Sequence, residues 1–187
     1  MDAMGVPSNS AIGKAKRRLG LFSRNRARGE RGATMVEFAI VAVPFFLLIF
    51  GTMEVGFIFW GTYELENATE DAARQIRTGH NLDANGFKDL VCGHVALLSQ
   101  CATKLRLDVR SFTSFSQIQS NQPSPLDANG TLQDNFTWNP GGPNSIVLVS
   151  TFYEWPLLTV LTSSVLSNMT DGNRLLGAAA AFKNESW

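Results

Sequence analysis

The most prominent pattern in the chain is an apolar run from Ala33 to Gly61, in which Glu37 and Glu54 are the only charged side chains. About 20 apolar residues in a helix are enough to span the hydrocarbon of a bilayer, so the run predicts a single transmembrane helix. Pro44 lies inside it, and membrane helices usually tolerate such a proline as a kink. The run is too long for a cleavable secretory signal, and no small-residue cleavage site follows it. A membrane anchor is expected over residues 33–61.

Beyond the anchor the apolar positions keep a helical period, which predicts that the same helix continues over residues 62–79. Its apolar face is formed by Leu65, Ala68, Ala72, Ala73 and Ile76, and charged residues take the opposite face. Gly79 is a suitable C-terminal stop. A second, short helix is predicted over residues 86–99.

The period then changes from that of a helix to that of a strand. In residues 104–112 apolar positions alternate with Arg106, Asp108 and Arg110, which predicts a strand with one buried and one solvated face. Residues 145–155 are rich in β-branched and aromatic side chains and form the clearest strand, and residues 175–184 are interpreted as an edge strand. The polar segment 113–143 is a long connection. The expected fold is an α+β domain containing an antiparallel sheet, on a long N-terminal helix.

The formal net charge of zero hides an asymmetry between the two ends of the chain. Residues 1–32 carry eight basic and two acidic side chains, whereas the remaining residues carry eight basic and fourteen acidic ones. Basic residues directly before a membrane helix keep their side in the cytoplasm. We therefore interpret residues 1–32 as a cytoplasmic leader rather than a nucleic-acid-binding arm, and residues 62–187 as an exported domain.

The two cysteines of the chain, Cys92 and Cys101, both lie in the part that is expected to be exported. In an oxidising compartment such a pair indicates a disulfide. Two free thiols, or half of a metal site completed by His94, are the alternatives.

Other candidate chemistry is sparse. His80 and His94 have no serine, cysteine or carboxylate at a spacing typical of catalysis, and the acids of the chain are not grouped as calcium ligands. The aromatic residues of the C-terminal half are more typical of core packing than of a binding surface: Trp138, Phe152, Tyr153 and Trp155. We predict no catalytic residue, no metal and no cofactor. For Glu54 two interpretations are open, a partner helix or the outer membrane boundary.

The basic leader ending in Gly32, followed by Ala33-Thr-Met-Val-Glu37-Phe38 and an apolar helix, resembles the class III signal of type IV pilins and pseudopilins. More specifically, the chain resembles the TadE-like family, the minor pseudopilins of the tight-adherence (Tad/Flp) pilus system. The resemblance includes "EDAARQIRTG", the cysteine pair before "LRLDVRSF", "NPGGPNSIVLVSTFYEWPLL" and the closing "AAAFKNESW". The family tail usually reads Arg-Asn-Glu-Pro, whereas this chain has Lys183 and Ser186 at its two ends.

The resemblance implies a type IV pilin-like fold and a protein that is a substrate rather than an enzyme. Prepilin peptidase is expected to cut after Gly32 and free the amine of Ala33; Phe38 belongs to the same processing motif. Glu37 would then lie beside the ammonium group of a neighbouring subunit. The implied partners are the peptidase, other Tad pilins or pseudopilins and the inner-membrane assembly platform, with the C-terminal domain in the periplasm or the fibre.

Three alternatives oppose this interpretation. Glu37 could lie at the membrane interface and reach toward lipid headgroups. The chain could be an unprocessed single-pass protein whose exported domain is an envelope binding module. An anchored periplasmic enzyme is the least supported, because no catalytic constellation is visible in the sequence.

Overall fold

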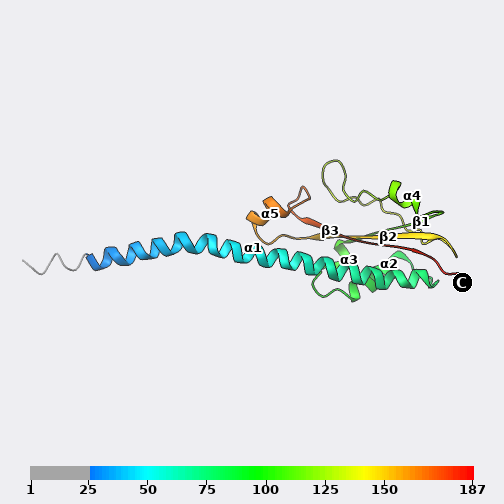
Figure 1. Ribbon diagram of the computed structural model, residues 1–187, viewed down its shortest axis with the longest axis horizontal. Helices are drawn as coiled ribbons and strands as arrows, with labels where there is room; N and C mark the ends of the chain where they lie inside the picture. The colour runs from blue at the N-terminus through cyan, green and yellow to red at the C-terminus, as the bar shows by residue number, and fades with distance from the viewer. Residues whose placement is uncertain (1–25) are drawn as a thin grey trace, which may run out of the picture. The chain divides into compact units, whose positions relative to one another are not determined.

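The computed structural model describes residues 26–187, apart from the side chains of residues 26–31, 160 and 161. The predictions for residues 1–25 of the leader lie outside the described residues. The elements follow the chain as α1 (Arg26–Arg77), α2 (Ala84–Gly93), α3 (Cys101–Lys104), β1 (Leu105–Phe112), α4 (Ser116–Ser120), β2 (Ile146–Trp155), α5 (Val160–Leu166) and β3 (Arg174–Lys183) (Figure 1). The chain divides into two units at Ile49 and Phe50.

In the first unit, the described part of α1 is apolar around its whole circumference. Between residues 32 and 49 every residue is exposed except Ala42 and Ile49, which are half-buried. The helix has a mean hydropathy of 2.3 in its most apolar 18-residue window, enough for a membrane span. Pro44 lies inside α1 without ending it.

In the second unit, α1 is amphipathic and provides one wall of the core. Its apolar face buries the residues that the periodicity predicted: Leu65, Ala68, Ala72, Ala73 and Ile76. The helix ends in a Schellman motif, since the N–H of Gly79 bonds the carbonyl of Ile76 at 3.1 Å and the N–H of His80 bonds that of Gln75 at 3.0 Å. Gly79 has a φ of +82°, which explains why glycine stands at this stop.

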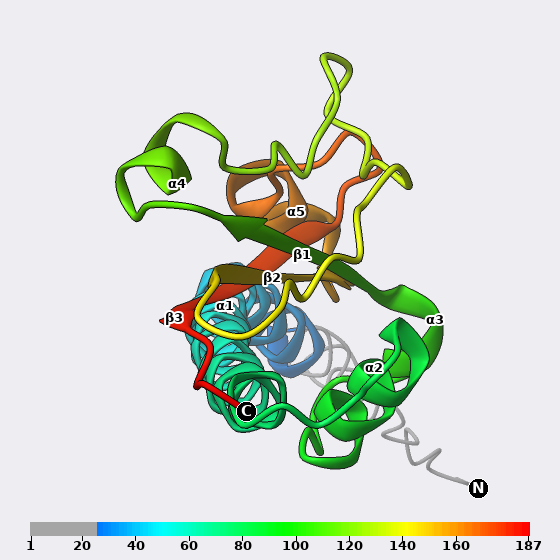
Figure 2. The same cartoon turned by 90° about the vertical axis from the view of Figure 1, so that its right-hand side faces the viewer.

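The three strands form an antiparallel sheet in the order β1-β2-β3, so the predicted α+β fold class is confirmed. In the register, Leu105 pairs with Tyr153 and Ile146 pairs with Lys183. One face of the sheet packs on α1 (Figure 2), where the fully buried Tyr153, Val149 and Val147 meet the helix residues. The predicted edge strand is β3.

The other face of the sheet is covered by the long connection between β1 and β2. Ile118 of α4 packs on Ile146 and Leu148, while Leu132 packs with Phe152 and Met169. These two small clusters show that the connection is part of the fold and shields the second face from solvent.

The prediction of a solvated face on β1 is wrong at Asp108, whose side chain is 0% exposed. The connection covers it, and its carboxylate accepts a hydrogen bond from the N–H of Thr137 at 2.9 Å and an ion pair from Arg110 at 2.7 Å. A buried carboxylate needs such partners, and periodicity alone does not show that a later segment supplies them.

The one helix that the sequence predicted outside α1 is shorter than expected, and three further short helices were not predicted. The helix expected over residues 86–99 ends at Gly93, with His94 as its C-cap, and the chain then turns before the four-residue α3. Asp83 caps α2 by accepting the N–H of Gly86 at 2.8 Å. The periodicity did not predict α3, α4 or α5, because helices of four to seven residues are too short to establish a period.

Candidate functional site on the N-terminal helix

The residues of the predicted processing motif lie together near the start of α1. Gly32, Ala33, Glu37 and Phe38 are all exposed, and Phe38 is 71% accessible. The carboxylate of Glu37 has no hydrogen-bond or ion-pair partner among the residues whose side chains the structure describes. The helix begins at Arg26, so the Gly32–Ala33 bond lies inside α1 rather than before it.

Among the acids of α1 whose side chains the structure describes, Glu54 is the buried one, and it joins the helix to α5 and to the segment just before it. Its side chain is 2% exposed. One carboxylate oxygen accepts the N–H of Leu158 at 2.6 Å, and the other accepts the hydroxyl of Thr162 at 2.5 Å. Thr162 is itself held by the N-cap Thr159. Glu54 therefore lies inside the second unit and makes its contacts within this chain, a third possibility beside the partner helix and the outer membrane boundary that the sequence left open.

Further along α1, two contacts attach the helix to the sheet. A Cβ on Gly61 would lie 2.9 Å from the ring of Trp155, so glycine is needed for this close approach. The hydroxyl of Thr69 bonds that of Thr151 at 2.7 Å in the core. Sequence periodicity did not predict this buried hydrogen bond, because a threonine on the apolar face of a helix fits the pattern of a small core residue equally well.

The C-terminal tail closes over the end of α1. The N–H of Glu185 bonds the carbonyl of Arg77 at 3.0 Å, and their side chains form an exposed ion pair at 3.4 Å. The amide of Asn184 donates to the carbonyls of Pro140 and Gly142, both at 3.0 Å. The two tail positions that agree with the resemblance, Asn184 and Glu185, both make structural contacts.

The predicted disulfide is present between Cys92 near the end of α2 and Cys101 at the start of α3, with a Cα–Cα distance of 5.6 Å. The loop that it closes is tied to α1 by the carboxylate of Glu64, which accepts the N–H groups of Ala96 at 3.1 Å and Leu97 at 2.9 Å. The hydroxyl of Tyr153 donates to the carbonyl of Ser99 at 2.6 Å, and burial raises the pKa of this tyrosine.

Lys88 of α2 also reaches this region. Its ammonium donates to the carbonyl of Ala102 at 3.1 Å. Partial burial, followed by repulsion from Arg106, lowers the pKa of Lys88 below its usual value. The contact links α2 to α3 in parallel with the disulfide.

The two histidines and the four aromatic residues that the sequence analysis singled out all contact other residues of the fold. The ring of His94 bonds the carbonyl of Leu90 at 2.8 Å, and the ring of His80 bonds the hydroxyl of Thr78 at 3.0 Å. The four aromatic residues pack in or against the core, as predicted; for example, the rings of Trp138 and Phe87 lie 5.6 Å apart.

A comparison with protein families gives a match over residues 32–74 to the model described as TadE-like protein. The match begins at the predicted processing glycine and covers the apolar run and most of the amphipathic part of α1. Searches of curated proteins and of solved structures gave no match. The resemblance of the segments after Arg74 therefore stays a prediction.

TadE-like pilus proteins are structural proteins and not enzymes. Residues 32–74, less than half of the chain, are similar to the TadE-like family, and this similarity indicates a protein associated with a Tad pilus.

Proposed function

We propose that this protein is a minor pseudopilin that takes part in the assembly of a Tad/Flp-type pilus, and thereby in adhesion and surface colonisation. In this proposal it is made as an inner-membrane precursor, with residues 1–32 in the cytoplasm and the C-terminal domain in the periplasm. Prepilin peptidase then cleaves it after Gly32. The family match to residues 32–74 supports the association with the pilus, and the processing motif supports the cleavage.

The observation that carries the proposal is the carboxylate of Glu37, which has no partner among the described side chains and lies on an otherwise uncharged stretch of helix that is exposed except at the half-buried Ala42 and Ile49. A charge at this depth is costly in lipid unless it is paired. Cleavage after Gly32 creates an ammonium group on Ala33, at the helix end where the macrodipole already disfavours positive charge. When the Glu37 carboxylate of one subunit lies beside the Ala33 ammonium group of its neighbour, each group compensates the charge of the other. The pair also fixes the axial register of the packed helices.

The burial of α1 also supports a membrane anchor of the proposed kind. Glu54 is the first buried residue along the described helix. We propose that lipid surrounds residues 33–53, which at 1.5 Å per residue measure about 32 Å, close to the hydrocarbon thickness of a bilayer. The exposed Trp60 and Tyr63 follow about two to three turns after Glu54 and are suited to the outer interface. This span is shorter than the predicted 33–61, because the domain packs on residues 54–61.

A genetic complementation experiment tests the role of Glu37. In cells lacking the native gene, Glu37→Ala should insert into the membrane normally but fail to restore pili, whereas the matched variant Asp71→Ala should restore them. Asp71 is also an exposed acid of α1 but lies outside the apolar stretch. Normal piliation with Glu37→Ala would contradict the charge-pairing account and favour the unprocessed envelope binding module.

A further inference from the structure

β3 lies at one edge of the sheet, and no other strand of the described residues pairs with its outer side. The N–H of Val109 is directed to Thr137 and therefore away from β2. Because the backbone direction alternates along an antiparallel ladder, the register leaves the backbone groups of Gly177, Ala179 and Ala181 pointing away from β2. These three residues are exposed, and for Gly177 the exposed surface is backbone. The opposite edge differs, since Val109 of β1 bonds both Thr137 and Asn139.

This edge is unusually open. Proteins commonly protect an edge strand with charged residues, prolines or bulges. Residues 177–181 are Gly-Ala-Ala-Ala-Ala, and β3 pairs with β2 residue by residue from Arg174 to Lys183. A strand with such small side chains leaves space on both of its faces for the side chains of a neighbour.

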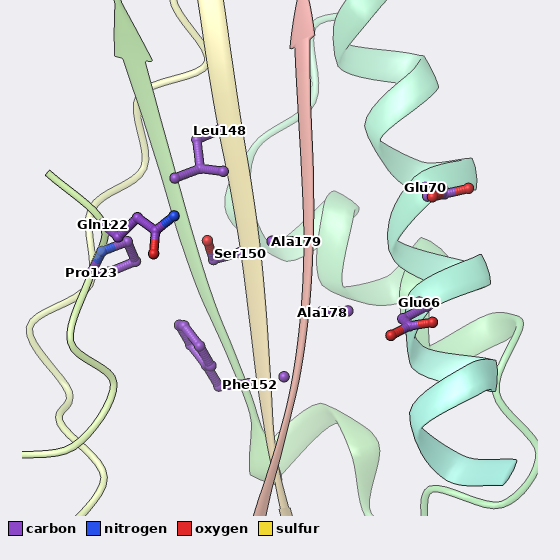
Figure 3. A pocket seen from close by; sticks show the side chains of 10 residues that line it. Glu66, Glu70, Gln122, Pro123, Leu148, Ser150, Phe152, Ala178 and Ala179 are labelled. Atoms are coloured by element: carbon purple, nitrogen blue, oxygen red, sulfur yellow. The ribbon is translucent and has the colours of Figure 1, made fainter. Parts of the chain in front are cut away.

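A groove of about 320 Å³ runs along the edge (Figure 3). Residues 177–179 form its floor. Phe152 and Pro123 border it over the outer face of the sheet, and Glu66 and Glu70 of α1 border it on the other side. A strand added to β3 would therefore have a mixed boundary on one face, where Gln122 and Ser150 lie beside the apolar residues, and an acidic boundary on the other.

The two acids suit a strand in their spacing as well as in their charge. Glu66 and Glu70 are exposed, and neither has an ion pair or hydrogen bond with another residue of the described chain. Residues four apart in a helix are separated by about 6 Å along its axis. Residues two apart in a strand are separated by about 6.6 Å. Basic side chains at alternate positions of an added strand would thus meet both carboxylates.

We propose that the β3 edge binds an extended segment of another protein in which basic residues alternate with apolar ones. The backbone of the segment would pair with Gly177, Ala179 and Ala181, its basic side chains would face Glu66 and Glu70, and its apolar side chains would lie toward Phe152 and Pro123. A second copy of β3 lacks this pattern, since it offers alanine and glycine at the same positions. The inference does not depend on cleavage at Gly32.

The test uses the full-length protein in a neutral detergent and a fluorescent eight-residue peptide of alternating lysine and valine, with binding followed by anisotropy. The double variant Glu66→Lys/Glu70→Lys should weaken binding at least about tenfold. The control Asp71→Lys/Asp89→Lys makes the same change in net charge on exposed residues outside the groove and should bind nearly as the wild type. Equal binding by the groove variant and the wild type would overturn the proposal.

Backbone pairing is tested separately from charge. Two peptides, N-methylated either at every lysine or at every valine, keep the charges but each lose one set of backbone donors. At least one of them should fail to bind, and peptide binding should slow amide hydrogen exchange at Ala179 and Ala181 more than at Ala180, which is already paired. Binding by both methylated peptides would reduce the contact to electrostatics and overturn the proposal. Concentration-dependent dimers that dissociate in Ala179→Pro would identify a second copy as the occupant, and would overturn it too.

Discussion

The carboxylate of Glu54 accepts the hydroxyl of Thr162 at a distance of 2.5 Å, across 108 residues of sequence. A charged residue inside an apolar run is thereby explained by its contacts with the C-terminal part of the second unit. The contact also sets the point along α1 at which the domain begins to cover the helix.

We predict that Thr162→Val lowers the free energy of unfolding of the detergent-solubilised protein by on the order of 1–3 kcal/mol, because one oxygen of the buried Glu54 loses its donor. Thr162→Ser keeps the hydroxyl and should cost much less. Thermal unfolding by circular dichroism measures both, and a larger loss in Thr162→Ser than in Thr162→Val would show that the methyl group, not the hydrogen bond, stabilises this contact.

The disulfide should contribute measurably to stability. Replacing Cys92 and Cys101 together by serine is expected to cost about 2–3 kcal/mol, because the ten-residue loop is no longer closed in the unfolded chain. Non-reducing peptide mapping of protein taken from the native envelope provides the accompanying chemical check. Recovery of both cysteines as free thiols would contradict the assignment of an oxidising compartment.

Gly79→Ala should destabilise the end of α1 for two reasons. Its φ of +82° is unfavourable for alanine, and the new Cβ would collide with the indole of Trp187. The expected loss is more than about 1 kcal/mol. Gly93→Ala is the matched control, since nothing lies within 4 Å of a Cβ at this helical position, and it should be neutral or slightly stabilising. Adding Trp187→Ala to Gly79→Ala should relieve the steric part of the loss; no relief would place the whole effect in the backbone.

The carboxyl group of Asp127 makes the local stability of the long connection depend on pH. Hydrogen bonds from the N–H groups of Thr131 and Asn129 lower the pKa of this carboxyl below its ordinary value of 3.8. A lowered folded-state pKa means that the stabilisation is complete above pH 3.8 and is lost as the pH falls through the lower folded value. Amide exchange at Thr131, relative to its intrinsic rate, should therefore stay constant above pH 3.8 and accelerate only at lower pH. In Asp127→Asn, where nothing titrates, that acid-dependent increase should disappear.

Much of this fold could be predicted from local patterns. The helical period of residues 62–79 and the β-branched run that became β2 both produce the elements they indicate, because each pattern extends over several turns or residue pairs. Gly79 likewise ends α1 for a local reason, its positive φ. These features depend on short-range physics.

Features that depend on distant segments could not be predicted in the same way. Asp108 is buried because residue 137 returns to cover it, and Glu54 is buried because α5 does so. Likewise, the edge groove exists only because α1, β3 and the segment near Pro123 meet in space. A single sequence gives no measure of such pairings, although an acid inside a long apolar run signals that a partner is needed.

The central claim is that Gly32 is a processing site, and the mass of the mature N-terminus tests it most directly. The protein should be extracted from membranes of cells with and without prepilin peptidase and analysed intact. The account predicts a chain beginning at Ala33 only when the peptidase is present. A chain that retains residues 1–32 in peptidase-containing cells that assemble pili would contradict it.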